Sequence, residues 1–146
     1  MKDSMSEKDL LLIRRAIELS LESVKRGGGP FGAVIVKNGK IVSESYNQVT
    51  LHNDPTAHAE IGAIREAARK LNTFDLSGCS IYVSCEPCPM CLGAIYWARI
   101  DKVFFASTRS DAENIGFDDS FIYEEISRPM NERKMDSNSV SGRKRL

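Results

Sequence analysis

The sequence predicts a layered α/β domain in which helices cover a single sheet. Segments with helical apolar spacing alternate with β-rich runs along the chain, and this order is typical of that fold class. Asn38-Gly39 is the dipeptide of a tight hairpin turn, so the first two strands should be antiparallel neighbours. The later strands are separated by helices and are expected to be parallel. With 146 residues the chain has the length of one domain, and it shows no internal repeat.

The first predicted helix runs from Ser6 to Lys25. Ser6 is expected to cap it, with Asp9 three residues later completing the capping motif. The run of glycines and proline at 27–30 ends the helix. Five apolar residues recur at three- and four-residue steps and predict its buried face: Leu10, Ile13, Ile17, Leu21 and Val24.

Four strands and further helices follow. The strands are expected at 31–37, 40–47, 79–84 and 102–107. A polar loop at 48–55 leads into a second helix at 56–71, and a third helix covers 87–99. Two short helical stretches are expected near 111–114 and 118–126. The end of the chain is polar and lacks apolar periodicity, which predicts one domain over 1–133 and a mobile tail over 134–146.

Composition argues against several classes of function. Lys and Arg together number 20, as do Asp and Glu, and this balance disfavours a nucleic-acid partner because phosphate binding needs basic excess. The first seven residues lack the apolar stretch of a signal peptide, and no apolar run is long enough to cross a bilayer. We therefore expect a cytoplasmic protein without a membrane partner. Three of the four cysteines lie within seven residues, and in a reducing compartment this clustering indicates metal or redox chemistry.

Two short segments carry residues suited to metal chemistry. His58-Ala59-Glu60 opens the second predicted helix, and the proline-rich segment with Cys88 and Cys91 opens the third, where Pro87 suits the first helical position. His58, Cys88 and Cys91 form a three-ligand set, which is typical of a catalytic zinc site because the fourth position stays open. The dipole of a first helical turn favours the thiolate, which is the form of cysteine that zinc binds.

Glu60 lies beside this ligand set and adds a proton carrier to it. Zinc lowers the pKa of water in its open position to about 7, but a leaving amine must still be protonated. A carboxylate two residues from a ligand can carry that proton. The combination H-x-E with P-C-x-x-C is the signature of the zinc nucleobase deaminases, and its two halves together are far more specific than either alone. The sequence thus predicts an aminohydrolase with one Zn²⁺ per chain.

The cysteines also allow other interpretations. Cys85 precedes Cys88 by three residues, so a closed structural site with three cysteines and His58 is possible in principle. A redox C-x-x-C pair is a second alternative, although it leaves His58 and Glu60 without a role. Cys79 is expected to be a buried strand residue, since free cysteine behaves as a small hydrophobe.

Four stretches of the chain resemble a particular branch of these deaminases. They are residues 29–36, 53–60, 84–99 and 116–123, and the similarity runs from about Gly29 to Ile126. In these stretches the chain is similar to the small bacterial guanine deaminases, members of the cytidine-deaminase-like superfamily. The resemblance implies a three-layer α/β/α fold with a mixed sheet and helices on both faces. It also implies conversion of guanine to xanthine and ammonia in purine catabolism or salvage, and a homodimer.

The resemblance further implies a role for individual residues, beyond the three zinc ligands. Glu60 would take the proton of the attacking water and pass it to the ring and the amine. Asn47 would hydrogen-bond the purine, Phe31 would pack on its face, and Ala59 would also contact the substrate. Asp119 would face the amino group and carry protons as ammonia leaves. From the residues alone, Asn47 could equally end a strand, Asp119 could begin a helix, and Phe31 could belong to the core.

Rival functions stay open at this point. A tRNA adenosine deaminase shares the zinc signature, although the balanced charge disfavours an RNA substrate. Deamination of cytosine or ammeline needs only small changes of pocket shape. A binding module that has kept the metal site without catalysis is an alternative from a different class. The chain also departs from the resembling family after Arg133, where those enzymes continue into a more apolar segment that helps close the pocket.

Overall fold

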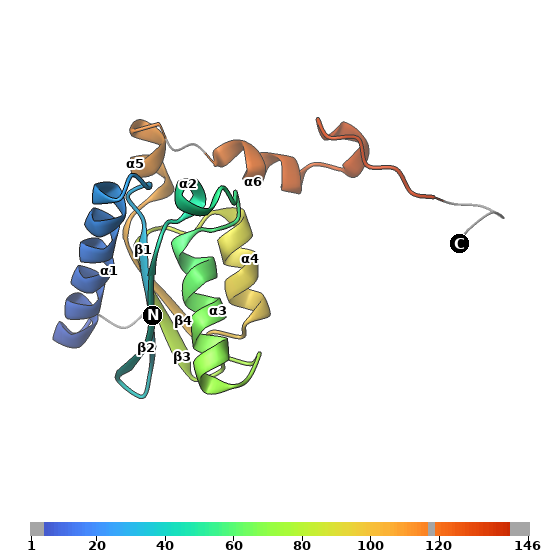
Figure 1. The fold of residues 1–146 in the computed structure, drawn as a ribbon. Helices are drawn as coiled ribbons and strands as arrows, with labels where there is room; N and C mark the ends of the chain where they lie inside the picture. Colours follow the sequence, from blue (N-terminus) through green and yellow to red (C-terminus); the bar gives the residue numbers. More distant parts are fainter. Residues whose placement is uncertain (1–4, 117–118, 141–146) are drawn as a thin grey trace.

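A single four-stranded sheet forms the centre of the fold (Figure 1). The computed structural model describes residues 5–116 and 119–140. The strands are β1 (Gly32–Lys37), β2 (Lys40–Tyr46), β3 (Cys79–Cys85) and β4 (Lys102–Ser107), in the order β2-β1-β3-β4. β1 is antiparallel to both of its neighbours, and β3 is parallel to β4. The predicted hairpin and the predicted parallel pairing are confirmed, and β1 alone runs against the other strands.

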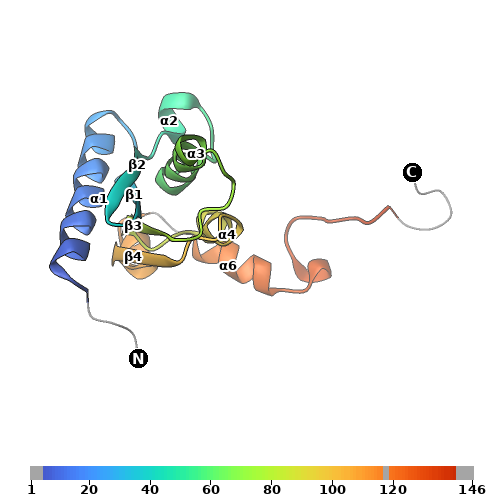
Figure 2. The same cartoon turned by 90° about the horizontal axis from the view of Figure 1, so that it is seen from below.

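Helices cover both faces of the sheet, so the predicted three-layer arrangement is confirmed (Figures 1 and 2). On one face α1 (Glu7–Lys25) packs against β1 and β3 through a core that includes Leu12, Ala16 and Leu19. On the other face lie α3 (Ala59–Leu71) and α4 (Pro89–Trp97). These two helices pack against the second face of the sheet through another core. In this core α3 contributes three alanines at four-residue spacing: Ala59, Ala63 and Ala67.

The start of α1 agrees with the prediction, but its buried face does not. The side chain of Ser6 accepts from the main-chain N–H of Asp9, whose carboxylate accepts from the N–H of Ser6. Of the five residues predicted to be buried, only Ile13 is, and Leu10, Leu21 and Val24 are about half exposed. The buried face is built from different residues: Leu12, Ile13, Ala16, Leu19, Ser20 and Ser23. Its small members let the helix backbone approach the sheet closely, which the bulkier predicted face would prevent.

Two predicted helix starts are also shifted. The helix expected from 56 begins at Ala59, because the carboxylate of Asp54 accepts from the N–H and the hydroxyl of Thr56 and holds that segment in a turn. The helix expected from Pro87 begins at Pro89, with Cys88 as its N-cap. The predicted loop at 48–55 contains a one-turn helix, α2 (Val49–His52).

The remaining elements lie after β4. They are α5 (Arg109–Asn114), α6 (Ser120–Ser127) and a short 3-10 helix, η1 (Met130–Glu132). The predicted start of the last helix at Asp118 and the final part of the predicted tail, 141–146, lie outside the described residues. After α6 the chain extends away from the layered body (Figures 1 and 2). None of the helices in the described ranges combines the length and apolarity that a bilayer crossing requires.

The close approach of α1 to the sheet predicts that Gly32 cannot be enlarged. A Cβ atom at Gly32 would lie 2.2 Å from the carbonyl oxygen of Ala16 and 2.8 Å from the main-chain nitrogen of Ser20. We expect Gly32→Ala to lower the free energy of unfolding by about 3 kcal/mol, the upper part of the range for overpacking, because rigid backbone must move. Urea unfolding followed by circular dichroism measures this change.

Gly62→Ala is the matched control for this prediction. A Cβ at Gly62 meets only the side chain of Ser45, which can rotate away, and alanine also favours the helix. We expect the stability of this variant to stay within about 1 kcal/mol of the wild type. Equal losses in both variants would show that backbone proximity at Gly32 is not the cause.

A second prediction concerns the tie between α1 and β3. The hydroxyl of Tyr82 donates to the carboxylate of Asp9 at 2.5 Å, and this bond, together with the one from Ser6, lowers the pKa of Asp9. Asp9 therefore stabilises the fold above its unfolded pKa of about 3.8, and this contribution is lost as the pH falls through the lower folded value. We expect Asp9→Asn to be less stable than wild type at pH 7.

The difference between wild type and Asp9→Asn should shrink below about pH 4, and thermal unfolding across pH 2 to 7 measures it. Asp111→Asn is the control, because Asp111 caps α5 through Thr108 in the same way. Its carboxylate has no such bond to the sheet among the described contacts, so the loss should be smaller. A difference for Asp9→Asn that is independent of pH would contradict the assignment.

Candidate active site

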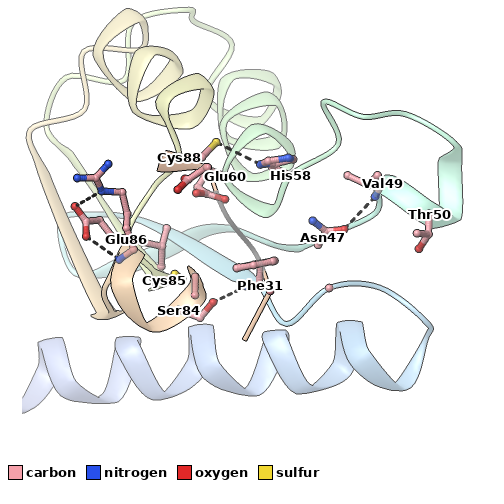
Figure 3. Close-up of a pocket in the computed structure, with 17 residues that line it drawn as sticks. Phe31, Asn47, Val49, Thr50, His58, Glu60, Ser84, Cys85, Glu86 and Cys88 are labelled. Carbon is pink, nitrogen blue, oxygen red and sulfur yellow. Dashed lines mark hydrogen bonds and ion pairs between the residues drawn. The ribbon is translucent and has the colours of Figure 1, made fainter. Parts of the chain in front are cut away.

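A cavity of about 460 Å³ opens at one edge of the sheet (Figure 3). β2, β3 and β4 run in the same direction and end there, and β1 begins there. The segments that follow these strand ends line the cavity together with the first turn of α3. Ligands bind at the carboxyl ends of strands in open α/β sheets, so the topology alone marks this edge as a site.

His58, Cys88 and Cys91 meet beside this cavity. The Nδ1 atom of His58 lies 3.6 Å from Sγ of Cys88 and 3.5 Å from Sγ of Cys91. In a tetrahedral zinc site, bond lengths of about 2.3 Å to sulfur and about 2.05 Å to nitrogen place these atoms about 3.6 Å apart. Both distances match a zinc site and all three ligand atoms lie within 4.8 Å of one another, and within the described ranges they form the one such cluster.

The starts of two helices bring these ligands together. His58 is the N-cap of α3, Cys88 is the N-cap of α4, and Cys91 lies in the first turn of α4. His58 and Cys88 both have extended backbone, and neither side chain caps its own helix. Their side chains are thus free to turn toward the metal position. Pro89 supplies the helix-opening proline that the sequence analysis placed at Pro87.

The electrostatics of the cluster favour metal binding. A hydrogen bond from the thiol of Cys91, helped by His58, lowers the pKa of Cys88 to about 4. The same bond raises the pKa of Cys91. Without a metal the two sulfur atoms thus share one proton, and a metal ion would displace it. The expected preference for thiolate thus holds at Cys88, where hydrogen bonds from Cys91 and His58 cause it, whereas the pKa of Cys91 is raised in the absence of a metal.

Glu60 points into the cavity from the first turn of α3 (Figure 3). Its side chain is 7% exposed, and burial is the main cause that raises its carboxyl pKa. Figure 3 shows Glu60 beside Cys88 and His58 but on the cavity side of them. A carboxyl group in this position can exchange protons with a molecule in the cavity.

Phe31 and Asn47 line the same cavity from the ends of β1 and β2. Their backbones are joined, because the N–H of Asn47 donates to the carbonyl of Phe31 at 3.0 Å. The side-chain oxygen of Asn47 accepts from the N–H of Val49 at 3.2 Å. This bond fixes the orientation of the amide, so its Nδ2 group is left to donate toward the cavity. A flat aromatic ring and an amide donor together suit a planar heterocycle.

Of the two remaining predicted site residues, Asp119 lines the cavity and Ala59 does not. Asp119 begins α6 but does not cap it with its side chain, and it lines the cavity. Its charge contributes to raising the pKa of His58, Cys85 and Tyr123, so its carboxylate lies close to the site. Ala59 is fully buried in the core and does not line the cavity. Any contact of Ala59 with a substrate would use its main chain.

The alternative interpretations of the other cysteines can now be decided. Cys85 lines the cavity, and its thiol donates to the carbonyl of Thr108 at 3.7 Å. Burial raises the pKa of Cys85 to about 11, so it is a thiol and no part of the ligand cluster. Cys79 is fully buried in β3, as the sequence analysis expected.

Other cavity residues were missed from the sequence. Glu86 follows β3 directly and accepts from the N–H of Arg109 at 3.0 Å, and Arg109 follows β4. The guanidinium of Arg109 stacks 3.9 Å from the centre of the Tyr123 ring, whose hydroxyl donates to the carbonyl of Pro87. These contacts hold α6 against the loop that carries Cys88. Their position just after parallel strands is the signal that could have revealed Glu86 and Arg109.

Sequence comparison places these features among known enzymes. Residues 6–107 match the family model of the cytidine and deoxycytidylate deaminase zinc-binding region. The chain is 59% identical over 122 residues to the guanine deaminase of Bacillus subtilis, covering 83% of this chain and 78% of that enzyme. It is also 46% identical over 95 residues to the tRNA-specific adenosine deaminase of Aquifex aeolicus, covering 65% of this chain and 63% of the relative.

Solved structures agree with the sequence comparison. The crystal structure of the Bacillus subtilis guanine deaminase superposes with a TM-score of 0.89 at 54% identity, covering 94% of this chain and 87% of that one. The guanine deaminase of Nitrosomonas europaea superposes with a TM-score of 0.73 at 31% identity, covering 81% and 68% of the two chains. With its zinc-type ligand cluster and matching fold, the chain belongs to the cytidine and deoxycytidylate deaminase zinc-binding family.

Proposed function

We propose that the chain is a guanine deaminase, which converts guanine and water to xanthine and ammonia. The observation that carries the proposal is the placement of buried Glu60 beside a three-ligand zinc site, in a cavity that also presents Phe31 and Asn47. The similarity to guanine deaminases over most of the chain supports guanine as the base. Deamination of cytosine or ammeline is the nearest alternative, because it would require only small changes in the shape of the cavity.

The chain's residues divide the chemistry between them. His58, Cys88 and Cys91 would hold a zinc ion, which when bound would activate a water molecule as the nucleophile near neutral pH. Glu60 accepts the proton that this water loses as its oxygen bonds to C2 of guanine. Glu60 passes this proton to a ring nitrogen. It then takes the proton of the new C2 hydroxyl as the carbonyl forms and delivers it to the amino nitrogen as the bond from C2 to that nitrogen breaks. The leaving group is then ammonia.

Asn47 and Phe31 hold the base for this reaction. The Nδ2 group of Asn47 donates to an acceptor atom of the purine, because its oxygen is occupied by Val49. Phe31 packs on the face of the ring. Ala59, buried between His58 and Glu60 in the chain, contributes through its main chain. Asp119, which lines the cavity at the start of α6, faces the amino group and carries protons as ammonia leaves.

We further propose that the catalytic domain ends near Arg133 and is followed by a polar tail, 134–146. Arg133 donates to the carbonyls of Glu125, Ile126 and Arg128 and ties the end of the domain to α6. Between 135 and 140 the described chain contains no helix or strand.

A homodimer acting in the cytoplasm in purine catabolism or salvage completes the proposal. α4 is apolar around much of its circumference, yet Tyr96 and Trp97 are 72% and 81% exposed. A helix that is apolar on all sides is normally covered, so a second copy of the chain is the expected cover. Trp97 would then lie at an interface, one of the two positions that suit a tryptophan.

A tRNA adenosine deaminase is the second candidate, because the Aquifex aeolicus enzyme of that kind is 46% identical over 65% of this chain. Against it stands the balanced charge of 20 basic and 20 acidic residues. A binding module without catalysis would keep the metal cluster but would not need a buried carboxyl group beside it.

The substrate assignment predicts the outcome of an ammonia-release assay. Zinc-loaded protein is incubated with guanine, cytosine, adenine, ammeline, cytidine and an anticodon stem-loop RNA. We expect release from guanine, with xanthine as the other product identified by its absorbance. Turnover of another base alone would overturn guanine as the substrate. Turnover of the RNA alone would favour the tRNA enzyme, and zinc binding without any turnover would favour the binding module.

The role of Glu60 predicts a separation of turnover from metal binding. Glu60→Gln keeps the shape of the side chain but removes the proton carrier, so we expect kcat to fall by about 10²- to 10⁴-fold. Zinc measured by atomic absorption should stay at one per chain. Glu66→Gln is the control, since Glu66 lies on the same helix, paired with Arg69 near the surface. Undiminished turnover in Glu60→Gln would refute the assignment.

A further inference from the structure

Ser23 is a buried polar residue that lies behind the cavity without lining it. It belongs to the last turns of α1 and is fully buried. Its hydroxyl lies 2.6 Å from the carbonyl oxygen of Gly29 and 3.1 Å from the carbonyl oxygen of Asn47. Figure 3 shows α1 passing on the Phe31 side of the cavity. One hydroxyl thus joins the loop before β1 to the end of β2.

These two bonds from the Ser23 hydroxyl close a ring whose other hydrogen bonds are between main-chain groups. The N–H of Phe31 donates to the carbonyl of Gly29 at 2.8 Å, and the N–H of Asn47 donates to the carbonyl of Phe31 at 3.0 Å. The single hydroxyl proton of Ser23 closes the ring, because it is shared between the carbonyl of Gly29 at 2.6 Å and that of Asn47 at 3.1 Å. Phe31 and Asn47, the two residues assigned to the base, are therefore held in one hydrogen-bonded unit. We call this unit the Ser23 clamp: Ser23, Gly29, Phe31 and Asn47.

The end of α1 fixes Ser23 against this unit. The N–H groups of Gly28 and Gly27 donate to the carbonyls of Ser23 and Val24, and Gly27 has a φ of +87°. This pattern is a Schellman motif, which ends the helix and turns the chain back toward the sheet. A Cβ at Gly28 would lie 2.6 Å from the hydroxyl of Ser23 and 2.8 Å from the carbonyl oxygen of Asn47. The main chain at Gly28 therefore lies too close to Ser23 and Asn47 for any residue with a side chain.

We propose that Ser23 is a positioning residue for base recognition, acting through Phe31 and Asn47. The proposal rests on the function proposed above for these two residues. Ser23 cannot touch the substrate, because it is fully buried and lies outside the cavity. Its hydroxyl sets the distance between the aromatic face and the amide donor. Loss of the hydroxyl loosens both contacts to the base and leaves Glu60 and the metal ligands unchanged.

The test compares Ser23→Ala with Ser20→Ala in the full chain loaded with zinc. Ser20 is also buried on α1, but among the described contacts its hydroxyl donates within the helix, to the carbonyl of Ile17. We expect Ser23→Ala to raise KM for the base roughly three- to tenfold, the equivalent of one buried hydrogen bond, with kcat within about twofold. Ser20→Ala should change neither value. Equal KM values for the two variants, or a loss confined to kcat, would overturn the proposal.

A second measurement needs no substrate. Hydrogen–deuterium exchange of the segments 27–32 and 46–50 should be faster in Ser23→Ala than in wild type or Ser20→Ala, while 58–62 stays unchanged. This result would stand even if guanine proved to be the wrong base, in which case KM is measured for the base that reacts. Ser23→Cys exchanges the hydroxyl for a larger and weaker donor, so it replaces Ser23→Ala if that variant does not fold. Unchanged exchange in the folded variant would overturn the clamp.

Discussion

The site depends on the close packing of α3 against the sheet. Ala59, Ala63 and Ala67 recur at four-residue steps and are fully buried, so the helix lies nearer the strands than larger side chains would allow. This contact places the first turn of α3 at the edge where β2, β3 and β4 end. α4 begins at the same edge because β3 leads directly into it. His58 comes within 3.6 Å of Cys88 for this reason, although the two are 30 residues apart.

Burial then gives the assembled groups their chemical character. Desolvation raises the pKa of Glu60, whereas the hydrogen bond from Cys91 lowers that of Cys88. Two neighbouring groups are therefore driven toward opposite protonation states: a carboxyl group that can hold a proton and a thiolate that binds a metal. Cys85, only three residues before Cys88, stays a thiol because it is buried without such a donor. Cys88 and Cys91 can bind a metal because they lie at the start of α4, whereas Cys85 ends β3 and does not belong to the ligand cluster.

α1 supports the other wall of the cavity from the opposite face of the sheet. Its small residues allow backbone contact at Gly32, and its last turns hold the segments that carry Phe31 and Asn47 through Ser23. The same choice of face leaves Leu10, Leu11, Leu21 and Val24 exposed. Exposed apolar side chains on α1 and α4 thus lie on opposite sides of the layered body.

The sequence by itself determined the succession of the strands and of the longer helices, the hairpin at Asn38-Gly39, the cap at Ser6 and the identity of the metal-binding residues. Each of these is encoded within a few neighbouring residues, by turn chemistry, apolar spacing or the H-x-E and P-C-x-x-C motifs. Resemblance to a family added Phe31, Asn47, Ala59 and Asp119, and the structure places all but Ala59 in the wall of the cavity. The tertiary structure alone decided which face of α1 is buried, because a close approach to Gly32 outweighs the larger apolar stripe. It also decided which groups Arg109, Glu86 and Ser23 contact. The position of Glu86 and Arg109 just after parallel strands marks them as candidates, but their contacts join segments far apart in the chain and depend on the tertiary packing.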